Sequence, residues 1–295
     1  MSRVSFSLQR PVSALAALAL LAACAGKDAA HTAAATSPAA DSATVNADAP
    51  APATATTASA GDVAQGGGSR APNKQGRITV LEYHLVGTAK NSLYGRTAES
   101  FKQDLEEVYK RGYRPITVAQ MLDKDFRNVP AGMSPVVFVF DDASPEQFRY
   151  LDRNGRLEID PTSALGMMLE FQKTHPGWKN TATFCMLNGG AAGHNFFGDS
   201  PKFAGQQKAW RFQKVQWLHQ NGYELCAHTL WHARLDKYSD AVVQEQIARN
   251  VAGIDSAVPG YKVRSFALPY GIWPKNRALA SSGSWRDPKS GKTIA

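Results

Sequence analysis

Short apolar segments alternate with segments of helical periodicity through residues 77–268, and this alternation limits the fold more than any other feature. Strands are predicted over residues 77–84, 135–141, 181–187, 223–227 and 263–268. The run from Pro135 to Phe140 is apolar at every position, as is typical of strands in a parallel sheet covered by helices. The sequence therefore predicts an α/β fold with a parallel sheet or barrel.

The segments between these runs are predicted to be helical. Thr97 is placed to cap a helix whose apolar face contains Phe101 and Leu105 at helical spacing. Further helices are predicted over residues 164–173, 209–221 and 240–257, with a short one around Met121 and the start of another strand at 292–294. In folds of this kind, functional residues lie at the carboxyl ends of the strands.

The amino-terminal region has the pattern of an export signal. Arg3 and Arg10 precede a short apolar run that ends in Leu21-Ala22-Ala23-Cys24 and looks like a bacterial lipobox. We expect residues 1–23 to be a lipoprotein signal peptide and Cys24 to carry the lipid. The alternative is an ordinary secretory signal with an incidental cysteine. Ala25, rather than Asp, follows the cysteine, which favours the periplasmic face of the outer membrane if the host is Gram-negative.

Residues 24–77 are rich in Ala, Thr, Ser, Gly and Pro, with few large apolar side chains, so we expect a disordered tether there. Residues 78–295 are then one domain in the cell envelope. The formal net charge is +8, but the basic residues are scattered and export disfavours a nucleic-acid partner. The oligomeric state stays open. Cys185 and Cys226 lie in predicted strands and can form a disulfide only if those strands are neighbours in a suitable register.

Two strand ends carry residues that could bind a metal or take part in catalysis. Asp141 and Asp142 follow the strand 135–141, and two adjacent carboxylates can divide between metal binding and substrate. His228 and His232 follow the strand 223–227 at a spacing that places two imidazoles on one side. A His–His–carboxylate set suits Zn²⁺ best, and also Ni²⁺, Co²⁺ or Fe²⁺. Each signal alone also fits an ordinary turn, cap or accidental pair.

Together these elements resemble the polysaccharide deacetylase family, also called carbohydrate esterase family four. Its motifs are matched by Val139-Phe140-Asp141-Asp142-Ala143, by His228-Thr229-Leu230-Trp231-His232 and by Arg264 to Gly271. The resemblance implies a distorted, incomplete (β/α) barrel. It further implies that Asp141 is the catalytic base and that Asp142, His228 and His232 bind a divalent metal. Arg264 would orient Asp141, the Tyr270 backbone N–H would stabilise an oxyanion, and Pro269, Tyr270 and His84 would contact substrate.

Two positions depart from the family pattern. Ala143 replaces the usual glycine, so the turn there needs an ordinary backbone conformation or must tolerate strain. The family's late Leu-x-His motif, whose histidine protonates the leaving amine, has no counterpart. Either the sequence ends before the last barrel elements, which we favour, or another group donates the proton. His84 and His194 are the candidates for that group.

The resemblance implies a metal-dependent hydrolase that removes N-acetyl groups from an N-acetylhexosamine polysaccharide such as peptidoglycan, a chitin-like polymer or poly-N-acetylglucosamine. Two alternatives stay open. One is a glycan-binding envelope lipoprotein without catalytic activity. The other is an O-acetyl esterase of the xylan type, which needs less acid assistance because an alkoxide leaves more readily than an amine anion.

Overall fold

The computed structural model of this protein describes residues 76–190, 194–198 and 206–294. The predicted signal peptide over residues 1–23, Cys24 and nearly all of the predicted tether over 24–77 lie outside these ranges. Within the described ranges, no helix combines the length and the apolar character that crossing a bilayer requires.

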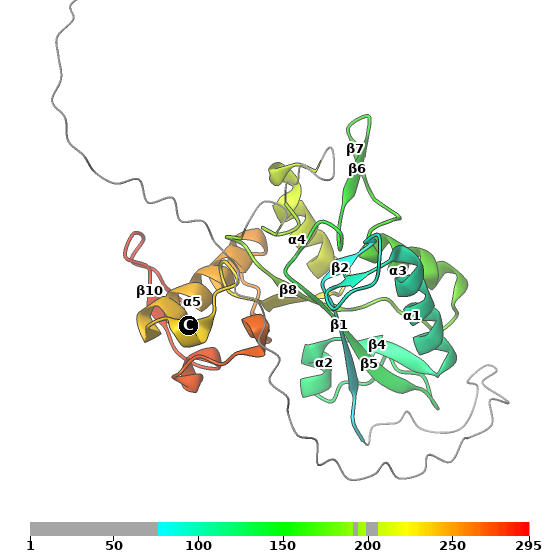
Figure 1. Ribbon diagram of the computed structural model, residues 1–295, viewed down its shortest axis with the longest axis horizontal. Coiled ribbons are helices and arrows are strands. Elements are labelled where there is room, and N and C mark those ends of the chain that lie inside the picture. Colours follow the sequence, from blue (N-terminus) through cyan, green and yellow to red (C-terminus); the bar gives the residue numbers. More distant parts are fainter. Residues whose placement is uncertain (1–75, 191–193, 199–205, 295) are drawn as a thin grey trace, which may run out of the picture. The chain divides into compact units, whose positions relative to one another are not determined.

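Parallel strands form the central sheet, as the sequence predicts (Figure 1). Its members are β1 (Thr79–Tyr83), β4 (Tyr113–Ile116), β5 (Ser134–Asp141), β8 (Thr183–Met186) and β9 (Glu224–Ala227). The long strand β5 pairs with β1 along one edge, and with β4 and then β8 along the other. β9 continues the sheet beyond β8. The predicted α/β fold with an incomplete parallel sheet is therefore confirmed.

The prediction of a fifth strand over residues 263–268 is wrong. The segment runs beside β9, but only Phe266 forms a bridge, with Ala227. Ala227 donates to the Ser265 carbonyl at 3.0 Å and accepts from the Ala267 N–H at 2.9 Å. The segment then turns into the short 3₁₀ helix η3 (Pro269–Gly271). A turn this close to β9 leaves too little extended chain for a regular ladder.

The predicted helices are present with small shifts at their ends. They are α1 (Ala98–Lys110), α2 (Val118–Leu122), α3 (Ala164–Thr174), α4 (Arg211–Gln220) and α5 (Asp240–Ala257). Thr97 caps α1 by accepting from the Ser100 N–H at 3.1 Å. Three further 3₁₀ turns are η1 (Lys208–Trp210), η2 (Leu235–Lys237) and η4 (Arg277–Ala280).

Three short pairs of strands lie outside the central sheet. β6 (Tyr150–Arg153) and β7 (Arg156–Ile159) form a hairpin. Asn154 and Gly155 at its tip both have positive φ, as the favoured two-residue hairpin turn requires. The other pairs are β2 (Leu85–Val86) with β3 (Gly95–Arg96), and β10 (Trp285–Arg286) with β11 (Thr293–Ile294).

The two faces of the sheet bury different cores. Phe138, Phe140 and Phe184 face the helices in the larger core, which also contains residues of α1, α3 and α4. Val139 and Cys185, which alternate with those phenylalanines, lie in a smaller core on the opposite face, the barrel interior. This alternation directs Asp141, two residues after Val139, toward the interior side at the end of β5.

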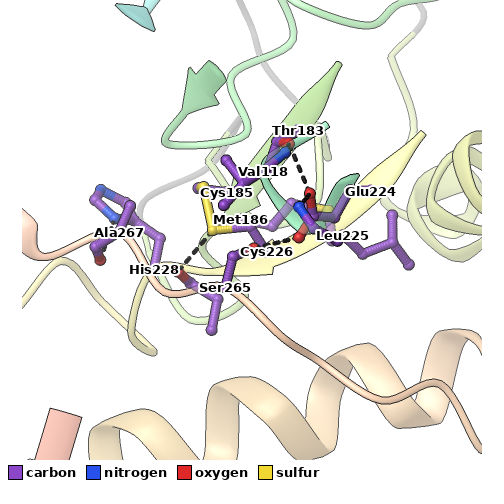
Figure 2. The surroundings of a disulfide bond; sticks show 12 residues. Val118, Thr183, Cys185, Met186, Glu224, Leu225, Cys226, His228, Ser265 and Ala267 are labelled. Carbon is purple, nitrogen blue, oxygen red and sulfur yellow. Dashed lines mark hydrogen bonds between the residues drawn. A yellow bond between two sulfur atoms is a disulfide. The ribbon is translucent and has the colours of Figure 1, made fainter. Parts of the chain in front are cut away.

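A disulfide joins β8 to β9 inside the smaller core (Figure 2). Cys185 and Cys226 are direct partners in the parallel register, and both side chains are buried. Beside them the carboxylate of Glu224 accepts from the Ala119 N–H at 2.8 Å, from the Thr183 hydroxyl at 2.8 Å and from the Ser265 hydroxyl at 2.7 Å. This buried carboxylate therefore ties the start of α2 and the segment beyond β9 to the sheet.

Candidate metal and catalytic site

Three predicted ligands converge at the carboxyl ends of β5 and β9. His228 Nε2 lies 3.3 Å from Asp142 Oδ1, and His232 Nε2 lies 3.6 Å from the same oxygen. One ligand atom from each of the three residues lies within 4.8 Å of the other two. The parallel strands therefore bring together side chains that are far apart in the sequence, at the edge where such sheets bind ligands.

The surroundings of these atoms fit a bound cation. Asp142 Oδ1 and His228 Nε2 are buried, and neither has a hydrogen-bond partner among the residues that the structure describes. His228 Nδ1 lies 3.0 Å from the Ala267 carbonyl, which directs Nε2 toward Asp142. Burial and the neighbouring His228 lower the pKa of His232, which favours the neutral imidazole that metal binding requires. Two imidazole nitrogens and one carboxylate oxygen suit Zn²⁺, and also Ni²⁺, Co²⁺ or Fe²⁺.

The backbone around the three ligands is strained. Asp142, Ala143, Thr229, His232 and Tyr270 all have φ between 53° and 78°, a region that non-glycine residues rarely adopt. Ala143 therefore tolerates strain where a glycine would not be strained. Its buried carbonyl accepts from the Phe197 N–H at 3.0 Å. Strain of this kind collects at functional sites, where surrounding contacts hold it in place.

Two buried polar residues of α5 hold the histidine loop. Asn250 accepts from the His228 N–H at 3.0 Å, and Gln246 accepts from the Trp231 N–H at 3.3 Å. Both side chains are completely buried. The sequence analysis missed them, although polar residues four apart on the same helix face as Val243 and Ile254 are a readable signal of a buried polar contact.

Asp141 lies beside the three ligands and is also buried. Burial raises its pKa to about 7, since the positive field of His228 only partly opposes the desolvation and the carboxylates of Glu82 and Asp142 add to it. Within the described ranges, its Oδ1 has no hydrogen-bond partner. The Gln147 amide donates to the carbonyls of Asp141 and His84, and so joins the ends of β5 and β1.

His84 lies at the end of β1, next to Asp141. Atoms of Glu82, His84 and Asp141 form a second group within 4.8 Å of one another. His84 Nε2 is 3.5 Å from Glu82 Oε1, and the Tyr94 ring contacts the imidazole edge-on at 5.0 Å between centroids. A cavity of about 380 Å³ opens beside these residues, and Tyr94 and Glu82 line it. His84 therefore lies at the edge of the site, where the sequence analysis places it.

The prediction that Arg264 orients Asp141 is wrong, because its guanidinium pairs with another carboxylate. It makes a bidentate pair with Asp123 at 2.6 and 2.7 Å on the exposed surface. Ala267, not Arg264, is the residue of this segment that contacts His228. Arg264 precedes Ala267 by three residues, roughly 10 Å along an extended chain, and alternation turns its side chain away from the interior.

The Pro-Tyr-Gly turn closes the other side of the site. Pro269 is buried, whereas Tyr270 is 61% exposed and its ring centroid is 4.5 Å from that of His232. Tyr270 therefore forms a wall of the site that a ligand can contact. His194, in the described segment 194–198, contributes to the electrostatic environment of His232 by lowering the pKa of that residue.

Comparison with known proteins agrees with this geometry. Residues 178–283 match the polysaccharide deacetylase family model, and this segment contains His228, His232 and the Pro-Tyr-Gly turn. This part of the chain is therefore similar to polysaccharide deacetylases, as the motifs of the sequence predict, and the similarity supports a deacetylase enzyme. No protein with a curated description matches the chain in sequence.

Among the solved structures that resemble this chain, one deacetylase supports the fold at a TM-score of 0.50. The Streptococcus pyogenes deacetylase PplD in complex with acetate is 15% identical, with a TM-score of 0.50 and coverage of 69% of this chain and 79% of that one. A polysaccharide deacetylase from Bacillus cereus is 15% identical with a TM-score of 0.47, covering 69% of this chain and 54% of that one. IcaB from Ammonifex degensii is 19% identical with a TM-score of 0.44, covering 68% and 77%.

Proposed function

We propose that this protein is a metal-dependent hydrolase that removes N-acetyl groups from an N-acetylhexosamine polysaccharide. The observation that carries the proposal is the convergence of Asp142, His228 and His232 beside the buried Asp141. The three converging residues would hold the ion, Zn²⁺ first among the candidates. A divalent ion there supplies Lewis-acid polarisation of the acetyl carbonyl and acidifies the attacking water.

The protein residues then have separate tasks. Asp141 accepts a proton from the attacking water, because its raised pKa makes it a stronger base than an ordinary carboxylate at neutral pH. The Tyr270 backbone N–H donates to the oxygen that becomes negative as the acetyl carbon turns tetrahedral. The exposed faces of Tyr270 and Trp231 offer aromatic surfaces for sugar rings. Pro269 fixes the turn that presents Tyr270.

The test is acetate release from N-acetylglucosamine oligomers, peptidoglycan fragments and acetylated xylan, measured with the protein chelated and then reloaded with Zn²⁺. We expect release from the N-acetylated substrates only after reloading, and its loss in Asp141→Asn. Release from xylan alone would favour the O-acetyl esterase. Binding of glycan with full metal content and no turnover would favour a binding lipoprotein.

A location in the cell envelope is also proposed, on the basis of Leu21-Ala22-Ala23-Cys24. Cys24 would carry lipid, and residues 25–77 would separate the domain from the membrane. Metabolic labelling with a fatty-acid analogue tests this. The label should enter the wild-type chain and not Cys24→Ser, and equal labelling of both chains would refute the anchor.

A further inference from the structure

We propose that Lys214 is a positioning residue for the metal site, because it supports, through Phe197, the strained turn that carries Asp142. This inference rests on the proposed metal-dependent function and goes beyond it by assigning a role to a residue that the mechanism does not use. Lys214 lies in α4 and is completely buried. Its Nζ donates to the Phe197 carbonyl and, at 2.8 Å, to Gln206 Oε1. Both acceptors are uncharged, so neither offsets the cost of burying a cation as a carboxylate would. Stability alone therefore does not explain the placement of Lys214.

The turn after β5 needs support because its backbone is strained. Asp142 and Ala143 have φ of 78° and 53°, a region that glycine adopts far more readily than other residues. Since Asp142 supplies Oδ1 to the metal site, relaxation of this turn would move a ligand. The Asp141 carbonyl before the turn accepts from the Gln147 amide. The Ala143 carbonyl after it accepts from the Phe197 N–H at 3.0 Å. Contacts from outside the turn therefore hold the backbone on both sides of Asp142.

Phe197 needs support of its own, since its φ is 57°. Its side chain is completely buried, and its ring packs against those of Phe148 and Phe184, each at 5.7 Å between centroids. The backbone N–H of Phe197 donates to the turn after β5, and its carbonyl accepts from Lys214. Lys214 therefore fixes the carbonyl side of the residue whose N–H holds the turn.

Lys214 can hold Phe197 because its own Nζ is fixed from a second direction. Gln206, which also accepts from Nζ, is tied to both backbone groups of Tyr150 at the start of β6. The rings of Phe148 and Tyr150 each have their centroid 5.9 Å from Nζ. The side chain of Lys214 therefore connects α4 and β6 to the backbone that supports the metal site.

The experiment measures the zinc affinity of the folded, full-length protein by competition with a chelator. Lys214→Met keeps the length of the side chain and removes its donor, so zinc binding should weaken on the order of 10–100-fold. Lys208→Met, on the exposed surface of η1, should bind zinc as the wild type does. Leu218→Ala removes a buried apolar side chain from α4 but no hydrogen-bond donor. It should unfold at a lower urea concentration and keep the wild-type zinc affinity.

Ala143→Gly in the Lys214→Met background gives a reading that a general loss of stability would not. Glycine reaches the required φ without strain, so the turn should depend less on Lys214 and zinc affinity should recover to within about threefold of the wild type. The inference is overturned if Lys214→Met binds zinc as the wild type does, if Leu218→Ala loses as much affinity, or if the glycine restores none of it.

A measurement on the wild type tests the inference even if Lys214→Met does not fold. Coupling between two contacts is reciprocal, so zinc should strengthen the contact that favours zinc binding. Loading with Zn²⁺ should slow hydrogen exchange at the Phe197 N–H at least about threefold more than at amides in the middle of α1. Equal slowing at both places would overturn the inference and leave the proposed function standing. If the wild type binds no zinc at all, the proposed function itself fails.

Discussion

The backbone N–H of His228 donates to the side-chain oxygen of Asn250 at 3.0 Å, so the middle of α5 fixes the position of a predicted metal ligand. The Asn250 amide in turn donates to the Met186 carbonyl at the end of β8 at 2.8 Å. One buried side chain thus connects two strand ends and a helix at the site.

Asn250→Ala should therefore weaken zinc binding by roughly 10–100-fold, because support residues of this kind orient the ligands. It should also destabilise the fold by about 1–3 kcal/mol, since the His228 N–H loses its partner in a buried place. Competition with a zinc chelator and urea unfolding measure the two effects. Asn221→Ala at the exposed end of α4 is the control. Unchanged zinc affinity would show that the loop containing His228 keeps its conformation without Asn250.

Asp141 and Asp142 are adjacent but should respond differently to loss of charge. Asp142→Asn should lower zinc content at a fixed zinc concentration and reduce deacetylation more than about 100-fold, since even outer contacts of a metal cost 10–100-fold. Asp141→Asn should keep its zinc and lose activity. Elemental analysis beside acetate release separates them. Loss of zinc in both variants would contradict the division of roles.

Arg264→Ala should have little effect. The guanidinium forms an exposed pair with Asp123, and such pairs contribute about 0–1 kcal/mol because solvent screens them. We expect a rate within about twofold of the wild type and a small drop in stability, matched by Asp123→Ala. A tenfold loss of deacetylation in Arg264→Ala alone would restore the orienting role that the family pattern implies.

The disulfide should contribute substantially to stability. Cys185 and Cys226 are 41 residues apart, and closing a loop of that size restricts the unfolded chain by roughly 4 kcal/mol in the chain-entropy description. Urea unfolding of the Cys185→Ala, Cys226→Ala double variant should show a loss of this order. Equal stability of the reduced and oxidised wild type would contradict the expectation.

Lys214 should make stability depend on pH. Its ammonium is completely buried and donates to the Phe197 carbonyl and to Gln206. Burial, with Arg149 nearby, lowers its pKa from 10.5 to about 7. Between these values the unfolded chain binds the proton more tightly, so stability falls as pH decreases from 10.5 to 7 and levels off below.

Urea unfolding of the wild type and of Lys214→Met at pH 7, 8 and 9 tests this. The wild type should gain stability relative to the variant by at most about 1.4 kcal/mol per pH unit. Lys208→Met, outside the buried site, should follow the wild type. Parallel pH profiles for the wild type and Lys214→Met would contradict the lowered pKa.

The strand ends and the convergence of Asp142, His228 and His232 could be predicted because they depend on short-range patterns. The apolar run Val136–Phe140 marks β5, and the aspartates after it must lie at its carboxyl end. The pairing of Cys185 with Cys226 depends on a register that single strands do not encode, and the sequence left it open. The Asn154-Gly155 hairpin carried a readable turn signal that was missed.

The place of Arg264 could not be read from spacing alone. A motif assigns an order along the chain, whereas the direction of a side chain depends on which residues of an extended segment face inward. Ser265 and Ala267 face the interior here, through Glu224 and His228. Gln147 was missed because contacts to backbone groups distant in sequence leave no periodic trace. Asn250 was also missed, although its position on the buried face of α5 was a readable signal.

The parallel register between β1 and β5 determines which insertions and deletions this chain can accept. Removing one residue from Thr79–Tyr83 would exchange the two faces of the strand, sending Tyr83 into the reaction site and His84 into the helix-covered core. Lengthening the tip between β6 and β7 does not change the face of the sheet to which any side chain of β1 points. Evolution or design can therefore vary the hairpin freely, while any change in the length of β1 must come in pairs.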